Sequence, residues 1–274
     1  MPIWAAARCT SAAVPYIKAF EWHGNMLLDG AFQLNCSADC AYSEAKSIWP
    51  NKRRDILLSL GTGKATRPKP PSYHSYVHLA NGVAGRIVDA EGAWEKFITT
   101  NEQKDRMFRL NPIYDGVGFE VDDFQKLDEI ETQAEEWMND VSQNGQLSDI
   151  CDRLIAALFF FRMILADDGV RGGEILCRLP ASLLERQNLV HGMLREADSK
   201  LFVVEYNGRS GTIYEDIDVK EALSSLDVTA ELRFPVKLCD LDTDEITVHV
   251  KMRTLGTRKL LPISGSPYVI RSEE

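Results

Sequence analysis

The stretch Asp55-Ile56-Leu57-Leu58-Ser59-Leu60, closed by Gly61-Thr62-Gly63, decides the fold class. A short apolar run bounded by turn residues is typical of a buried parallel strand. Before it, a strand is expected within residues 25–28, and residues 37–49 have a helical composition that ends at Pro50. Strand, turn, helix and strand in this order indicate an α/β sheet. Because ligand sites in such sheets lie at the carboxyl ends of strands, Asp29 falls at a place of interest.

The rest of the chain changes character near residues 168–173. Helices are expected over residues 3–13, 91–107, 122–140 and 148–165, and later over 183–197. Strands are expected over residues 201–206, 231–238, 246–252 and 260–270, which are enriched in Val, Thr, Phe and Tyr. The sequence therefore predicts an α/β domain with a helical extension in residues 1–168 and a smaller β-rich domain in residues 173–274.

Composition restricts the classes of function. The formal net charge of −10 argues against nucleic-acid binding, which relies on Lys and Arg to neutralise phosphates. No apolar run approaches the roughly 18 to 20 residues that cross a bilayer, and the short apolar start lacks the basic region of a secretory signal. The six cysteines are too sparse for a disulfide scaffold. We predict a soluble cytoplasmic protein with reduced thiols, no spanning helix and no cofactor.

Asp29-Gly30 taken alone is a common turn dipeptide, and Asp-Gly recurs at 115–116 and 168–169. What distinguishes Asp29 is an ordered set of motifs around it. The motifs are the Ala-rich helix 3–13, Pro15-Tyr16, Phe20, Leu28-Asp29-Gly30-Ala31, Ser43-Glu44-Ala45, Ile48-Trp49-Pro50 and Leu58-Ser59-Leu60-Gly61-Thr62-Gly63. In order and spacing they resemble the carboxyl-terminal half of the patatin-like phospholipase domain.

The resemblance covers roughly residues 2–165. Downstream, Trp94 to Phe97, Phe108-Arg109-Leu110-Asn111-Pro112 and the acidic helix from Asp122 look like the larger patatin-like proteins of fungi. The resemblance implies part of a three-layer α/β/α fold and hydrolysis of lipid esters by a Ser-Asp dyad. It assigns Asp29 as the general base, with Gly30 and Ala31 shaping its turn. It also implies a lipid or phospholipid substrate and a location peripheral to membranes.

The sequence departs from the family pattern in two places. It contains no G-x-S-x-G nucleophile motif and no glycine-rich oxyanion loop. Residues 208–211 and 264–266 contain Gly and Ser but do not fit the G-x-S-x-G motif. Asn35-Cys36-Ser37 stands where the family commonly has Asn-Asn-Pro. We expect this chain alone to be inactive, with the missing part encoded upstream of Met1. The alternative is a catalytically inactive interaction or regulatory protein built on a partial patatin-like fold.

A missing central strand has a physical consequence. The flank of a parallel sheet that normally has a neighbour would be exposed, and unpaired strand edges invite association. We therefore expect marginal solubility or self-association.

Three other motifs resemble known sites or folds. Gly61-Thr62-Gly63-Lys64 suggests a phosphate loop. The Walker pattern, however, requires Gly at position 58, where this chain has Leu58, and Ser or Thr at position 65, where it has Ala65. Possible zinc ligands were Cys36, Cys40, His74 and His78, which lack the usual short spacings, so no metal site is predicted. Residues 263–270 resemble the closing strand of filamin-type immunoglobulin-like repeats.

Overall fold

The computed structural model describes most of the chain. The described residues are 1–13, 17–30, 34, 36–67, 89–118, 124–143, 145–165, 171–180, 184–195, 200–208, 211–219, 223, 231–239, 245–255 and 258–271. The chain divides into two compact units: unit 1 is Met1–Lys52 with Leu57–Met138, and unit 2 is Arg53–Ile56 with Asn139–Glu274. This division falls upstream of residues 168–173. The assignment of separate domains to residues 1–168 and 173–274 stays a prediction.

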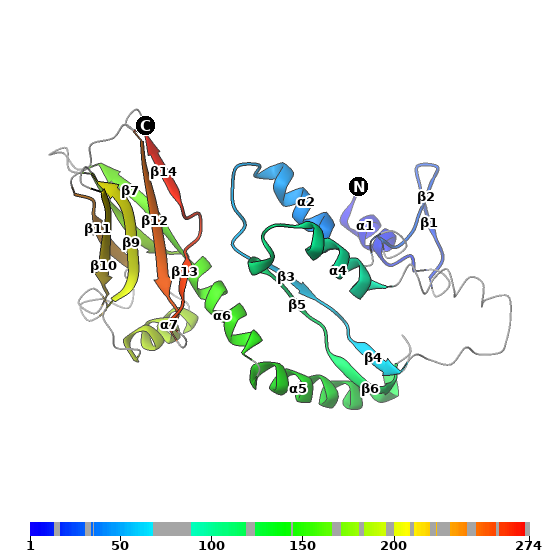
Figure 1. Ribbon diagram of the computed structural model, residues 1–274. Coiled ribbons are helices and arrows are strands. Elements are labelled where there is room, and N and C mark those ends of the chain that lie inside the picture. The colour runs from blue at the N-terminus through cyan, green and yellow to red at the C-terminus, as the bar shows by residue number, and fades with distance from the viewer. Residues whose placement is uncertain are drawn as a thin grey trace. The chain divides into compact units, whose positions relative to one another are not determined.

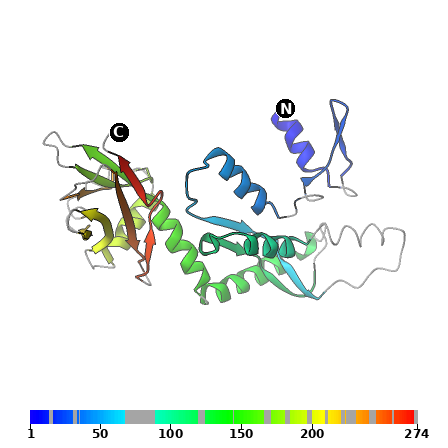
Figure 2. The same ribbon diagram turned by 45° about the horizontal axis from the view of Figure 1, so that its top comes forward.

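Unit 1 begins with a helix beside a hairpin (Figures 1 and 2). Helix α1 spans Ile3–Thr10, and β1 (Phe20–Trp22) pairs antiparallel with β2 (Asn25–Leu27). The strand expected near residues 25–28 is thus formed. Its described partner is β1 in a hairpin rather than a parallel strand. The reason is the two-residue turn His23-Gly24, whose φ angles of 47° and 76° suit a tight hairpin.

The α/β part of unit 1 contains two pairs of parallel strands (Figure 1). Strand β3 (Leu57–Leu60) pairs with β5 (Met107–Leu110), and β4 (Lys64–Arg67) pairs with β6 (Ile113–Val117). Parallel pairing of the Leu57–Leu60 run is therefore confirmed. The strand is only partly buried, however, because Leu60 is 71% exposed.

Two helices accompany these strands. Helix α2 (Ala38–Ile48) contacts both β3 and α4 (Ala90–Thr100). Together these elements enclose a small core of Cys36, Ala38, Trp94, Phe97 and Met107. The helix expected over residues 91–107 ends at Thr100, since the Asn101 side chain donates to the Phe97 carbonyl at 2.7 Å and occupies an acceptor of the last turn. A short 3-10 turn, η2 (Lys104–Arg106), leads into β5.

The middle of the chain corrects another expectation. After η3 (Phe124–Lys126) come α5 (Leu127–Gln143) and α6 (Gln146–Ala157). The helix expected over residues 148–165 ends at Ala157, and Phe159–Leu165 forms strand β7. Phe159 and Phe161 are buried on one side while Arg162 is exposed. Aromatic residues favour this extended geometry, in which alternate side chains point to the same face.

Unit 2 is built from antiparallel strands in two sheets (Figure 1). The first sheet has the order β11 (Arg233–Lys237), β8 (Arg171–Cys177) and β7. The second has the order β10 (Gly211–Asp218), β9 (Lys200–Gly208), β12 (Glu245–Arg253) and β13 (Leu260–Pro262), with β14 (Tyr268–Arg271) also on β12. Helix α7 spans Leu184–Arg195. The strands expected over residues 201–206, 231–238 and 246–252 and the helix expected near 183–197 are confirmed. Residues 260–270 were expected as one strand, but they form β13 and β14, which pair separately with β12.

Both sheets of unit 2 contribute to one apolar core. Phe159 lies 5.1 Å from Phe202 and 6.4 Å from Phe234 between ring centroids, and all three side chains are fully buried. As a whole the described structure is mixed α/β. Among its described residues, none of the helices is both long and apolar enough to cross a membrane.

Candidate functional site

Asp29 lies two residues after the end of β2 in unit 1. Its backbone N–H donates to the Ala12 carbonyl at 3.1 Å, which ties the end of the hairpin to the segment that follows α1. The residue is half-buried. Gly30 does not adopt the left-handed conformation, and a methyl group there would meet no described heavy atom within 4 Å. The described surroundings therefore do not require glycine at position 30, and Ala31 lies outside the described residues.

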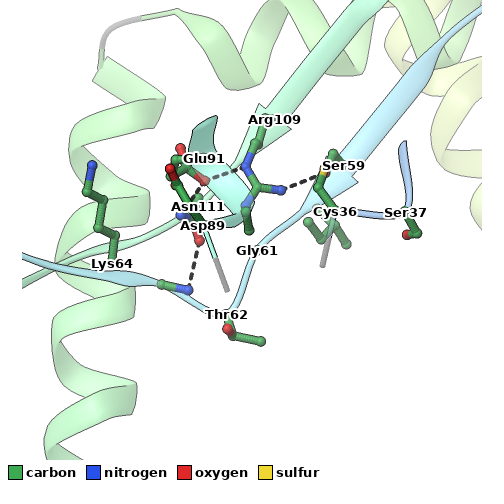
Figure 3. A pocket seen from close by; sticks show the side chains of 13 residues that line it. Cys36, Ser37, Ser59, Gly61, Thr62, Lys64, Asp89, Glu91, Arg109 and Asn111 are labelled. Carbon is green, nitrogen blue, oxygen red and sulfur yellow. Dashed lines mark hydrogen bonds and ion pairs between the residues drawn. The ribbon is translucent and has the colours of Figure 1, made fainter. Parts of the chain in front are cut away.

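A cavity of about 380 Å3 opens at the carboxyl ends of β3 and β5 (Figure 3). Its walls come from the segment before α2, the loop between β3 and β4, the start of α4 and the end of β5. The lining residues are Cys36, Ser37, Ser59, Leu60, Gly61, Thr62, Gly63, Lys64, Asp89, Ala90, Glu91, Arg109 and Asn111. Asp29 does not line this cavity. The position agrees with the general rule that ligand sites in parallel sheets lie at the carboxyl ends of the strands.

The loop Gly61-Thr62-Gly63 forms one wall because two glycines allow close packing. A Cβ atom at Gly61 would overlap the Asn111 amide, and one at Gly63 would overlap the Tyr114 ring. Gly63 also has a φ of +108°, in a region that favours glycine. Its N–H donates to Asn111 Oδ1 at 2.8 Å. The sequence interpretation treated this loop only as a strand end and missed its role in building a cavity.

A partly buried ion pair joins the cavity walls (Figure 3). Arg109 Nε donates to Glu91 Oε1 at 2.6 Å, and a terminal nitrogen of Arg109 donates to Ser59 Oγ at 2.7 Å. Asn111 Nδ2 donates to the same Glu91 oxygen at 2.8 Å. The side chains of Arg109 and Glu91 are 8% and 30% exposed. This network joins the start of α4 to both β3 and β5.

The partner of Ser59 limits the chemistry of this site. A serine becomes a nucleophile when a positioned base accepts its proton. A guanidinium carries only hydrogen-bond donors, so Arg109 does not act as that base for Ser59. The arrangement favours binding over nucleophilic catalysis.

The candidate zinc ligands do not assemble into a site among the described residues. Cys36 is buried in the cavity wall, and Cys40 is exposed on α2. His74 and His78 lie outside the described residues. Within the described ranges, no group of three or more His, Cys, Asp or Glu side chains is placed to hold a metal ion.

Comparison with known proteins points to phospholipases. No protein-family model matches the chain, and no solved structure matches it. Phospholipase A I of Arabidopsis thaliana is 28% identical over 158 residues, 56% of this chain and 12% of its own length. Calcium-independent phospholipase A2-gamma is 27% identical over 147 residues in Mus musculus and 26% over 135 in Homo sapiens. These matches cover 53% and 48% of this chain, and 18% and 17% of those proteins.

The aligned part is therefore a minor share of each relative, and the chain spans less than a fifth of the length of the proteins it matches. Over about half of its own residues, this chain is similar to phospholipases, which supports its resemblance to the patatin-like phospholipase family.

Proposed function

We propose that this chain is part of a lipid acyl hydrolase that cleaves carboxylic esters of phospholipids at a membrane surface. Residues 1–168 would contribute to a three-layer α/β/α patatin-like domain. The observation that carries the proposal is the similarity to phospholipases over 56% of the chain, which accompanies the Leu28-Asp29-Gly30-Ala31 motif.

Asp29 is the proposed general base. A serine hydroxyl attacks an ester carbonyl efficiently only when a positioned group accepts its proton. Asp29 supports this role through its carboxylate, its half-buried position after β2 and the hydrogen bond from its backbone N–H to Ala12. The nucleophilic serine and the oxyanion donors would come from outside these 274 residues, which contain no G-x-S-x-G. Without those groups the tetrahedral intermediate is neither formed nor stabilised.

A complementation experiment tests this proposal. A segment with a glycine-rich loop and G-x-S-x-G, taken from a patatin-like phospholipase, is joined ahead of residue 1. Fatty-acid release from phospholipid vesicles is then measured. We expect turnover by the joined protein, and a loss of about 1,000-fold in kcat when Asp29→Asn removes the base.

Asp115→Asn is the matched control, because Asp115 also precedes a glycine, is exposed, and is not assigned to the dyad. Equal activity of the Asp29→Asn and Asp115→Asn proteins would reject the role of Asp29. Hydrolysis by residues 1–274 alone would show that the serine is not external. A folded joined protein without any turnover would favour the alternative of a non-catalytic interaction protein.

A further inference from the structure

The wall of the cavity over Gly61-Thr62-Gly63 differs in its numbers of available hydrogen-bond donors and acceptors. Its wall carries two carboxylates, Asp89 and Glu91, and two cations, Lys64 and Arg109. Formal charge alone therefore predicts no preference for an anionic or a cationic ligand. Some wall groups are already hydrogen-bonded to each other. Only the remaining groups can bind a ligand.

One oxygen of each carboxylate in the wall accepts hydrogen bonds from neighbouring residues. One Glu91 oxygen receives hydrogen bonds from both Arg109 and Asn111, at 2.6 and 2.8 Å. Asp89 caps α4 by accepting the Gly92 N–H at 2.8 Å. The carbonyl oxygen of the Asn111 side chain accepts the Gly63 N–H. Both negative charges are therefore compensated locally, one by a buried guanidinium and one by the start of a helix.

The second carboxylate oxygens of Asp89 and Glu91 remain as acceptors, and a larger set of groups remains as donors. Among the described residues, no hydrogen bond or ion pair engages the Lys64 ammonium, the Thr62 hydroxyl and N–H, or the Ser37 hydroxyl. Ser59 Oγ accepts from Arg109, which leaves the serine's own proton free to be donated. These donors line the same cavity from four places: Ser37 before α2, Ser59 in β3, Thr62 in the loop after β3 and Lys64 at the start of β4.

We propose that this cavity binds a phosphate group, carried by a phosphomonoester or phosphodiester, with Lys64 as its countercharge. A tetrahedral phosphate presents several strong acceptor oxygens in different directions, which suits donors distributed over several walls. A planar carboxylate presents only two oxygens. The cavity volume of about 380 Å3 lies within the range of small-ligand sites. The site is distinct from the proposed dyad, since Asp29 does not line it, and it requires no hydrolytic activity.

Titration of residues 1–274 with inorganic phosphate and with glycerol 3-phosphate tests the site, at constant ionic strength. Isothermal calorimetry should show saturable binding with a Kd of about 1 mM or tighter. Lys64→Met should weaken binding about tenfold, because it removes a charge-assisted hydrogen bond. Thr62→Val should weaken it about threefold, because it removes a neutral donor. Both side chains are exposed, so folding of these variants can be verified by their thermal melts.

Lys96→Met is the matched control. Lys96 is exposed on α4 and does not line the cavity, and its replacement changes the net charge of the protein equally. The control should bind phosphate as the unaltered protein does. Equal weakening of phosphate binding by Lys64→Met and Lys96→Met would mean that only the net charge of the protein matters. That result would overturn the proposed site.

Vesicle sedimentation distinguishes the two sources of phosphate. If phosphatidic acid in phosphatidylcholine vesicles recruits the chain and inorganic phosphate displaces it, the ligand is a lipid headgroup. If only the free phosphates bind, the ligand is a small phosphate ester; both results support the proposal. Absence of saturable phosphate binding, or displacement of phosphate by an equal concentration of acetate, would overturn it.

Discussion

The two units bury apolar side chains to different extents. Among the described residues, the main core of unit 2 contains 22 buried residues, whereas the core of unit 1 contains five. Unit 1 instead leaves Ile3, Trp4 and Leu60 exposed by 90%, 62% and 71%. The difference follows from sheet type: two antiparallel sheets can cover each other, but parallel strands are buried only when helices cover both faces.

The units also differ in how they use charge. The Arg109–Glu91 pair of unit 1 has side chains that are 8% and 30% exposed. In unit 2, Lys259 and Asp149 approach within 2.6 Å, but their side chains are 55% and 46% exposed. The Arg109–Glu91 pair is therefore less solvated than the Lys259–Asp149 pair.

The largest expected effect tests the core of unit 2. Phe159→Ala should destabilise unit 2 by about 3 to 5 kcal/mol, because it leaves a cavity between the Phe202 and Phe234 rings. Hydrogen exchange of unit 2 peptides measures this loss. All five tryptophans belong to unit 1, so tryptophan fluorescence reports that unit separately. An equal shift in the fluorescence transition would show that the two units unfold together and would contradict separate cores.

Gly63→Ala should have the next largest effect, within unit 1. The new methyl group would overlap the Tyr114 ring and would stand at a φ of +108°, costing about 3 kcal/mol. Gly116→Ala is the control, because Gly116 has a φ of +91° but an open Cβ position among the described residues, and should cost about 1 kcal/mol. Urea unfolding followed by tryptophan fluorescence compares them. Similar costs would mean that backbone conformation, and not packing against Tyr114, requires Gly63.

Glu91→Ala tests the polar contacts of unit 1. It leaves the buried Arg109 Nε and the Asn111 amide without their shared acceptor, and should cost about 2 kcal/mol. The corresponding change in unit 2, Lys259→Met, should cost less than about 1 kcal/mol because that pair is solvated. Denaturant midpoints of each unit measure both. A larger cost for Lys259→Met would reverse the contrast between the units.

The smallest expected effect concerns the acid stability of unit 2. Burial raises the pKa of Asp216, but hydrogen bonds from Arg253 and Lys200 outweigh it and hold that pKa below the usual 3.8. A lowered pKa adds stability above the unfolded value that is lost as pH falls through the folded value. Stability of unit 2 should therefore decline more from about pH 5 to about pH 3 in the unaltered protein than in Asp216→Asn. Equal declines would contradict a role for Asp216.

Local patterns in the sequence predicted many of the elements correctly. The Leu57–Leu60 run is a parallel strand, α2 ends before Pro50, and the strands after residue 200 are formed. Residues 148–165 were predicted wrongly as one helix, because a continuous apolar segment reads alike in a buried helix and in a strand. Strand pairing across the β7 and β8 ladder decides the extended form of Phe159–Leu165.

The two candidate sites also differ in how far the sequence predicts them. Asp29 can be proposed from a contiguous motif, and its role as a general base stays a prediction. The cavity could not be proposed from the sequence, because Ser59 and Arg109 are 50 residues apart, and Glu91 and Arg109 are 18 apart. Gly61-Thr62-Gly63 was the available signal, but Leu58 and Ala65 break the Walker pattern, and Thr66 stands where G-x-G-x-x-G requires its third glycine.

The sequence by itself determined the α/β character, the position of Asp29 in its motif and the β-rich nature of the later residues. These features depend on local propensity and on the spacing of apolar side chains, which neighbouring residues set. Only the tertiary structure decided that β2 pairs in a hairpin, and that Glu91, Arg109 and Asn111 meet over the Gly61–Gly63 loop. Such contacts depend on which strands become neighbours, since parallel pairing brings together residues that are distant in the chain.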